Sequence, residues 1–92
     1  MSACIYILQF TKSKKYYVGS TDNLTRRLAQ HNQGHTFSTK LMGKFKLVFS
    51  QEVSNLKIAR ATEKQIKAWK RRDFIEKIIQ DGRIAFLDDE HP

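Results

Sequence analysis

The sequence contains a single cysteine, a single proline and no apolar run near the ~20 residues that a membrane-spanning helix needs. Because Cys4 has no second cysteine to pair with, the chain forms no internal disulfide, which favours a reducing compartment. The first residues, MSACIYIL, lack the basic n-region and long apolar stretch of a signal peptide. We therefore expect a cytoplasmic protein that does not associate with a membrane.

Acidic residues are also scarce, with nine Asp and Glu against 17 Lys and Arg and a net charge of +8. Residues 57–72 hold seven basic groups and only one acid, Glu63, whereas residues 73–92 hold two basic groups and six acids. A basic body with an acidic tail suits a polyanionic partner, most commonly nucleic acid. A chain of 92 residues makes one domain with a modest core. We expect this domain over residues 1–82 and an acidic tail over 83–92.

The spacing of the apolar residues predicts six elements in the order ββαβαα. The strands are expected at about residues 4–10, 15–20 and 46–53, and the helices at about 23–32, 54–72 and 73–80. Ser54 or Asn55 is the expected N-cap of the long helix, and Gly34 and Gly82 are expected just past helix ends. The predicted fold class is a mixed α/β (α+β) domain with a small three-stranded antiparallel sheet flanked by helices.

All three tyrosines lie in the stretch IYILQFTKSKKYYVGS, which reads as a hairpin with TKSK at its tip. A four-residue loop, or a two-residue loop within TKSK, places Tyr6 opposite Gly19 and Leu8 opposite Tyr17. Tyr6 and Tyr17 are then diagonal neighbours on one face, roughly 7–8 Å apart, and Tyr16 points to the other face. The alternative is that the tyrosines are ordinary half-buried strand residues.

The short helix carries two charged or titratable side chains on its apolar stripe. The stripe consists of Leu24, Arg27, Leu28 and His31, at positions i, i+3, i+4 and i+7. The leucines indicate that this stripe faces the sheet. Since burying an unpaired guanidinium is costly, Arg27 and His31 indicate that the stripe borders a cleft.

The long helix places its one acid on the side expected to pack. That face carries Ala59, Glu63, Ile66 and Lys70. The opposite stripe is purely basic and supplies the candidate nucleic-acid-binding residues Arg60, Lys64, Lys67 and Arg71. Glu63 is therefore either a functional carboxylate or a group that neutralises its basic neighbours, and helix geometry alone leaves both open.

The ordered set IYI, YVG, STDNLTRRLAQHN and ARATEKQIKAW resembles the GIY-YIG nuclease domain family over about residues 3–80. It is most similar to the small single-domain branch, related to the nuclease domains of excinucleases and homing endonucleases. Cys4 departs from the family pattern, because a glycine usually stands there. The catalytic positions implied by the resemblance are Tyr6, Tyr17, Arg27, His31 and Glu63, with Glu63 as the metal ligand. We expect Tyr6, Tyr17, Arg27 and Glu63 to line one cleft on one face of the sheet.

The resemblance implies an endonuclease that hydrolyses phosphodiester bonds of nucleic acid, DNA ahead of RNA, with Mg²⁺ or Mn²⁺. Glu63 would hold the metal, and Arg27 would stabilise the charge on the phosphate. A tyrosine, Tyr17 slightly ahead of Tyr6, would position or deprotonate the water, with His31 assisting proton transfer or holding a phosphate. A tyrosine base requires a lowered pKa. The alternatives are a nucleic-acid-binding module without catalysis and an adaptor that uses its acidic tail.

Overall fold

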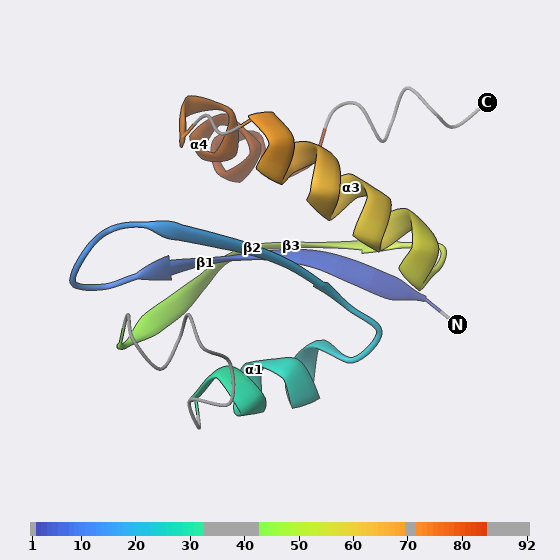
Figure 1. Ribbon diagram of the computed structural model, residues 1–92, viewed down its shortest axis with the longest axis horizontal. Coiled ribbons are helices and arrows are strands. Elements are labelled where there is room, and N and C mark those ends of the chain that lie inside the picture. The colour runs from blue at the N-terminus through green and yellow to red at the C-terminus, as the bar shows by residue number, and fades with distance from the viewer. Residues whose placement is uncertain (1, 33–42, 70–71, 85–92) are drawn as a thin grey trace.

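The computed structural model describes residues 2–32, 43–69 and 72–84 and has the predicted element order. The strands are β1 (Ala3–Phe10), β2 (Tyr16–Thr21) and β3 (Phe45–Val53), and the helices are α1 (Leu24–Asn32), α3 (Leu56–Trp69) and α4 (Arg72–Asp81). The antiparallel sheet has the order β2-β1-β3, with α1 on one face and α3 and α4 on the other (Figure 1). The predicted fold class is confirmed. Gly34 and tail residues 85–92 lie outside the described residues.

The hairpin between β1 and β2 has the predicted register. The Phe10 N–H donates to the Lys15 carbonyl at 2.9 Å, so TKSK forms a four-residue loop. Lys14 closes this loop with a φ of 63°, in the left-handed region. The register pairs Tyr6 with Gly19 and Leu8 with Tyr17.

The pairing of β1 with β3 contains a shift that changes which face β3 presents. Ile7 pairs with Phe49, but the next residue, Leu8, pairs with Leu47. An extra residue of this kind re-aims the side chains beyond it. As a result Phe49 joins the core on the α3 side, whereas Phe45 lies against the ring of His31 on the α1 side.

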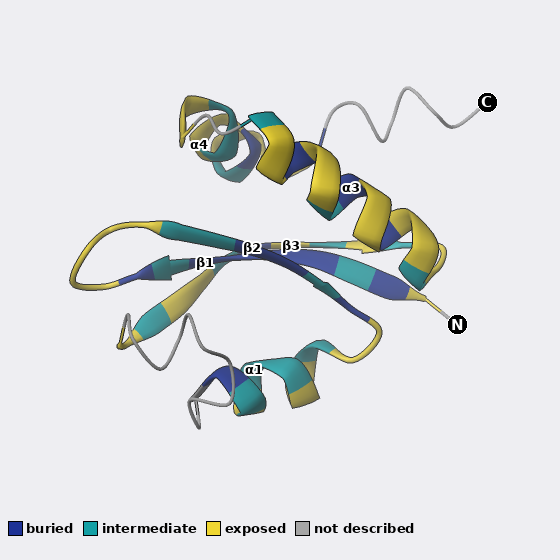
Figure 2. Ribbon diagram, viewed as in Figure 1, coloured by how far each residue is buried: buried dark blue, intermediate teal, exposed yellow. Residues whose placement is uncertain are grey.

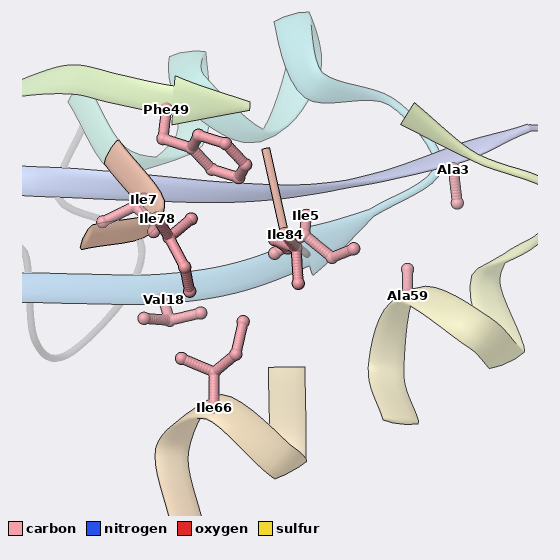
Figure 3. Close-up of a cluster of buried hydrophobic side chains, with 9 residues drawn as sticks. All are labelled: Ala3, Ile5, Ile7, Val18, Phe49, Ala59, Ile66, Ile78 and Ile84. Atoms are coloured by element: carbon pink, nitrogen blue, oxygen red, sulfur yellow. The ribbon is translucent and has the colours of Figure 1, made fainter. Parts of the chain in front are cut away.

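The aliphatic core lies between the sheet and the helices α3 and α4. Its buried members are Ala3, Ile5, Ile7, Val18, Phe49, Ala59, Ile66, Ile78 and Ile84 (Figure 3). Ala59, Thr62 and Ile66 are the buried residues of α3, and Figure 2 shows such buried positions between exposed ones along this helix. The Ile84 N–H donates to Gln51 Oε1 at 2.8 Å, which ties the chain after α4 to β3. Burial of each such isoleucine contributes roughly 1.5–3 kcal/mol.

Side-chain and glycine caps define the helix ends. Asn55, rather than Ser54, is the N-cap of α3, because its Oδ1 accepts the Ile58 N–H at 2.9 Å. Asn23 caps α1 in the same way, accepting the Arg26 N–H at 3.1 Å. Gly82 follows α4 with a φ of 74°, as expected of a C′ glycine. No helix within the described residues has both the length and the apolar character to cross a bilayer.

Candidate functional site

The face of the sheet under α1 holds a buried group of aromatic and imidazole rings around Tyr6. Tyr6 is 0% exposed, and its hydroxyl lies 2.9 Å from His31 Nε2. His31 is 2% exposed, and its ring centroid lies 5.1 Å from that of Tyr17. The Tyr6 hydroxyl also accepts a hydrogen bond from Arg27 Nε at 3.3 Å. The stripe of α1 that carries Arg27 and His31 therefore faces the sheet, as predicted.

The two strand tyrosines named as candidates lie on the same face. The ring centroids of Tyr6 and Tyr17 are 6.4 Å apart, and both rings contact His31. Tyr16 points to the other face, where it packs against the aliphatic core. The guanidinium carbon of Arg72 lies 4.9 Å from the centroid of the Tyr16 ring. The parity predicted from the hairpin is confirmed.

Gly19 allows Tyr6 to take this position. A Cβ on Gly19 would lie 2.4 Å from both Cζ and the hydroxyl oxygen of Tyr6. The phenol ring of Tyr6 therefore crosses the β2 backbone at Gly19, which has no side chain. The space that the missing side chain of Gly19 leaves is filled by the Tyr6 ring.

Glu63 lies on the other side of the sheet, with α3, and both of its carboxylate oxygens have partners. Ser20 Oγ donates to Oε1 at 2.5 Å, and Lys67 Nζ donates to Oε2 at 2.5 Å. The sequence analysis expected Glu63 on the same face as the tyrosines, and this expectation was wrong. Strand alternation carries Ser20 to the face opposite Gly19, where it meets α3.

A cavity of about 600 Å³ nevertheless joins the two faces. Its lining comes from the end of β2, from α1 and from α3: Ser20, Thr21, Asp22, Arg26, Arg27, Gln30, Leu56, Arg60, Glu63, Lys64 and Lys67. Since β2 is an edge strand, the cavity passes across the free edge of the sheet. Arg27 and Glu63 thus line one cavity from opposite sides, whereas Tyr6 and His31 lie behind Arg27 as the contacts that hold it.

The basic residues of α3 surround Glu63 instead of forming a separate stripe. Arg60, Lys64 and Lys67 all line the same cavity as Glu63. Residues three before and four after a given position lie on the same side of a helix, so the predicted separation was wrong. Arg71 and Lys70 lie outside the described part of the chain.

Ser20 is the site residue that the sequence analysis missed, although a signal for it was present. Once Tyr17 and Gly19 are assigned to the α1 face, alternation sends Ser20 to the face that α3 covers. Its hydroxyl is the neutral donor to Glu63. Asp22, Arg26 and Gln30 were also missed, although Arg26 and Gln30 are four residues apart on α1 and therefore share one of its faces.

Burial and charge set the protonation of the inner ring group. Burial raises the pKa of Tyr6, and this outweighs the opposing effect of the hydrogen bond from Arg27. Burial, followed by the charge of Arg27, lowers the pKa of His31, so its imidazole is neutral near pH 7. The hydrogen bond to Tyr6 raises the pKa of Arg27. Tyr6 therefore lacks the lowered pKa that a general base would need.

The oxygens around Glu63 are of the kind that a hard divalent cation prefers. Within residues 2–32, 43–69 and 72–84 no group of three or more His, Cys, Asp or Glu side chains comes together. The Glu63 carboxylate and the Ser20 hydroxyl instead offer oxygen donors beside a cavity. Mg²⁺ is commonly held by one or two carboxylates, with waters and substrate oxygens completing its shell. The donor set fits such an ion.

Comparison with known proteins gives matches at the levels of family, structure and sequence. The family model described as the GIY-YIG catalytic domain matches residues 2–78. The solution NMR structure of the UPF0213 protein BH0048 from Bacillus halodurans has a TM-score of 0.55 and 28% identity, covering 89% of this chain and 87% of that one. The structure-specific endonuclease subunit SLX1 of Phaeosphaeria nodorum is 46% identical over 44 residues. That match covers 45% of this chain and 12% of the relative.

Proposed function

The chain belongs to the GIY-YIG catalytic domain family, and from this membership we propose that it is an endonuclease that hydrolyses phosphodiester bonds of nucleic acid with a divalent metal ion. The observation that carries the proposal is the cavity at the edge of the sheet. It brings a guanidinium from α1 and a carboxylate from α3 to one space, although the two helices lie on opposite faces. These are the two charges that phosphoryl chemistry needs, one for the phosphate and one for the metal.

Arg27 is the proposed group for the charge on the phosphate. Its Nε donates to the Tyr6 hydroxyl at 3.3 Å, and one terminal nitrogen donates to Gln30 Oε1 at 3.2 Å. These contacts fix the plane of the guanidinium, so that its fork meets phosphate oxygens in a defined orientation. Tyr6 and His31 are in this view positioning residues, because both are buried and both act through Arg27 or through each other.

Tyr17 is the proposed residue for the attacking water. Tyr6 is fully buried and its hydroxyl contacts Arg27 and His31, whereas Tyr17 is half-buried. Lys67 Nζ lies 5.6 Å from the centroid of the Tyr17 ring, so a positive charge stands beside this phenol. Tyr17 would orient the water and take its proton.

Glu63 is the proposed metal ligand, with Ser20 beside it. A Mg²⁺ or Mn²⁺ ion bound there would supply Lewis-acid stabilisation of the departing oxygen. Ser20 holds one oxygen of the carboxylate from the β2 side, and this contact fixes the side chain relative to the strand that carries Tyr17. Binding of the polymer would fall to the cations around the cavity, chiefly Arg60 and Lys64. We propose DNA ahead of RNA as the substrate.

The experiment that tests this function is cleavage of end-labelled DNA and RNA oligonucleotides with Mg²⁺, with Mn²⁺ and with a chelator. The wild type is expected to cut only with metal. Glu63→Ala is expected to lose cleavage and to retain folding and nucleic acid binding, because it removes the metal ligand and adds to the net positive charge.

Glu76→Ala is the matched control, because Glu76 forms an exposed ion pair with Arg72 at 3.4 Å on α4, and it should cut like the wild type. Full activity of Glu63→Ala in Mg²⁺ would refute the mechanism. Cleavage of RNA in preference to DNA would correct the substrate and leave the chemistry standing.

The second candidate is a module that binds nucleic acid without cutting it. The observation that favours it is the pairing of both Glu63 oxygens, with Ser20 and with Lys67, which is what a purely charge-neutralising glutamate would show. In that case the wild type binds oligonucleotides but leaves them intact in every metal. Binding together with metal-dependent cleavage excludes this candidate.

A further inference from the structure

We propose that Lys67 competes with the metal ion for Glu63. Its ammonium group occupies the cation position at this carboxylate until a divalent ion displaces it. The inference rests on the proposed metal-dependent function. It adds a residue that sets metal affinity and names the contact that must break before the metal binds. Ser20, by contrast, keeps its contact with Glu63 throughout.

The two partners of Glu63 differ in how firmly they are placed. Ser20 belongs to β2 and pairs with Ile5 in the sheet, so its backbone is fixed. Lys67 lies one turn after Glu63 on α3 and reaches it with a flexible four-carbon stem. A hydroxyl is neutral and has lone pairs to offer a cation, whereas an ammonium group is a cation without lone pairs. A divalent ion at Glu63 is therefore compatible with Ser20 and incompatible with Lys67 in its present position.

The exposure of the pair makes this displacement easy. The Lys67 side chain is 49% exposed and the Glu63 side chain is 22% exposed. Ion pairs that water reaches to this degree are weak, because solvent screens them and the lysine stem loses conformational freedom. The ion pair between Lys67 and Glu63 is thus strong enough to weaken metal binding at Glu63 but too weak to prevent it. Its loss should tighten metal binding by about twofold to fivefold, the range set by exposed ion pairs.

The displaced ammonium group has another partner available. Lys67 itself lines the cavity, and its Nζ already lies 5.6 Å from the Tyr17 ring centroid. A phosphate oxygen in the cavity would take the place of the Glu63 carboxylate. The same lysine would then oppose metal binding in the free protein and bind phosphate once metal and nucleic acid are both present, which couples the two binding events.

The test is a titration of the full chain with Mn²⁺ alone, without nucleic acid, following the electron paramagnetic resonance signal of the free ion. Lys67→Met is expected to bind Mn²⁺ about twofold to fivefold more tightly than the wild type. Lys64→Met is the matched control, because Lys64 lines the same cavity and carries the same charge. It reports the general effect of removing one cation, and Lys67→Met should exceed it. Lys67→Arg should bind like the wild type.

Glu63→Gln should lose the Mn²⁺ site, and thermal melts should show that every variant is folded. Equal increases in Mn²⁺ affinity in Lys67→Met and Lys64→Met would overturn the inference, as would weaker Mn²⁺ binding in Lys67→Met than in the wild type. If the wild type cuts nucleic acid with metal and Lys67→Met shows no gain, the competitor role fails and the proposed function stands. An absence of Mn²⁺ binding in every variant would overturn the inference and the metal part of the proposed function together.

Discussion

Two adjacent residues of β2 build the site from both faces of the sheet. Because Gly19 has no side chain, the Tyr6 ring can cross the strand and reach Arg27 and His31. Ser20 points the other way and donates to Glu63 on α3. Because consecutive strand residues alternate between faces, one short stretch positions both Arg27, proposed to bind phosphate, and Glu63, proposed to bind the metal.

Substitution of Gly19 by alanine tests the first of these contacts. The new methyl group would stand 2.4 Å from Tyr6 Cζ, so the buried ring would have to move. Overpacking of this kind typically costs about 1–3 kcal/mol. We expect Gly19→Ala to lower the free energy of unfolding by that amount and to slow cleavage, because the displaced Tyr6 no longer orients Arg27. Urea denaturation and cleavage rates measure the two effects.

A double-mutant cycle identifies the cause of the loss. In a Tyr6→Ala background the alanine at position 19 should cost little further stability, since the side chain it meets is absent. Gly82→Ala serves as the control, because its φ of 74° is strained for alanine but lies at the end of α4. It should lose stability with no change in the cleavage rate of the folded protein. A fully stable and active Gly19→Ala would contradict the role of Gly19.

At the scale of elements, α3 supplies an acid surrounded by bases. Arg60, Lys64 and Lys67 line the cavity with Glu63, so the helix presents one anionic point within a cationic surface. Phosphate groups can contact the bases while the carboxylate stays available to a cation. One helix thus carries the groups proposed for both tasks.

The basic residues of α3 predict a salt-dependent affinity. Each phosphate contact should contribute about −0.9 to the slope of log affinity against log salt on duplex DNA. Arg60→Ala/Lys64→Ala should therefore weaken binding and make that slope shallower by up to about 1.8. Fluorescence anisotropy over a salt series measures both quantities.

A double variant in the hairpin loop, Lys12→Ala/Lys14→Ala, removes the same charge from exposed positions that do not line the cavity. Its slope should match that of the wild type. A wild-type affinity without salt dependence, or equal slopes in the two double variants, would rule out α3 as the phosphate-binding element.

The sequence predicted the elements well and their relations across the sheet poorly. The parity of Tyr6 and Tyr17 followed from the length of one loop, and the helix ends followed from Asn55 and Gly82, because these signals are local. The position of Glu63 depends on β2 lying at the edge of the sheet, and periodicity does not determine strand order. The contact of Glu63 with Lys67, four residues later on the same helix, is local, and it matches the neutralising role that helix geometry left open.

The whole molecule has two unlike layers on either side of one sheet. The layer under α3 and α4 is largely aliphatic, and the layer next to α1 holds Tyr6, Tyr17 and His31. The second layer is polar in part, and within the described residues every buried side-chain nitrogen and oxygen atom has a hydrogen-bond partner. A buried and fully paired histidine makes the stability of the fold sensitive to pH.

His31 sets the direction of that pH dependence. Burial and the charge of Arg27 lower its pKa in the folded protein, whereas the pKa of a histidine in the unfolded chain is about 6.5. As pH falls through this value the unfolded chain takes up a proton that the folded protein does not. The unfolded state therefore binds more protons, and stability decreases as pH falls, until the folded His31 also titrates. Above the unfolded pKa the stability associated with His31 is fully present.

We therefore expect the melting temperature of the wild type to rise between pH 5 and pH 7, and that of His31→Gln to rise less over the same range. Carboxylates also titrate toward the acid end, but they are present in both proteins, so the difference between the two curves reports His31. Thermal melts at constant ionic strength provide the measurement. Parallel curves for wild type and His31→Gln would show that burial and the charge of Arg27 do not keep the imidazole neutral.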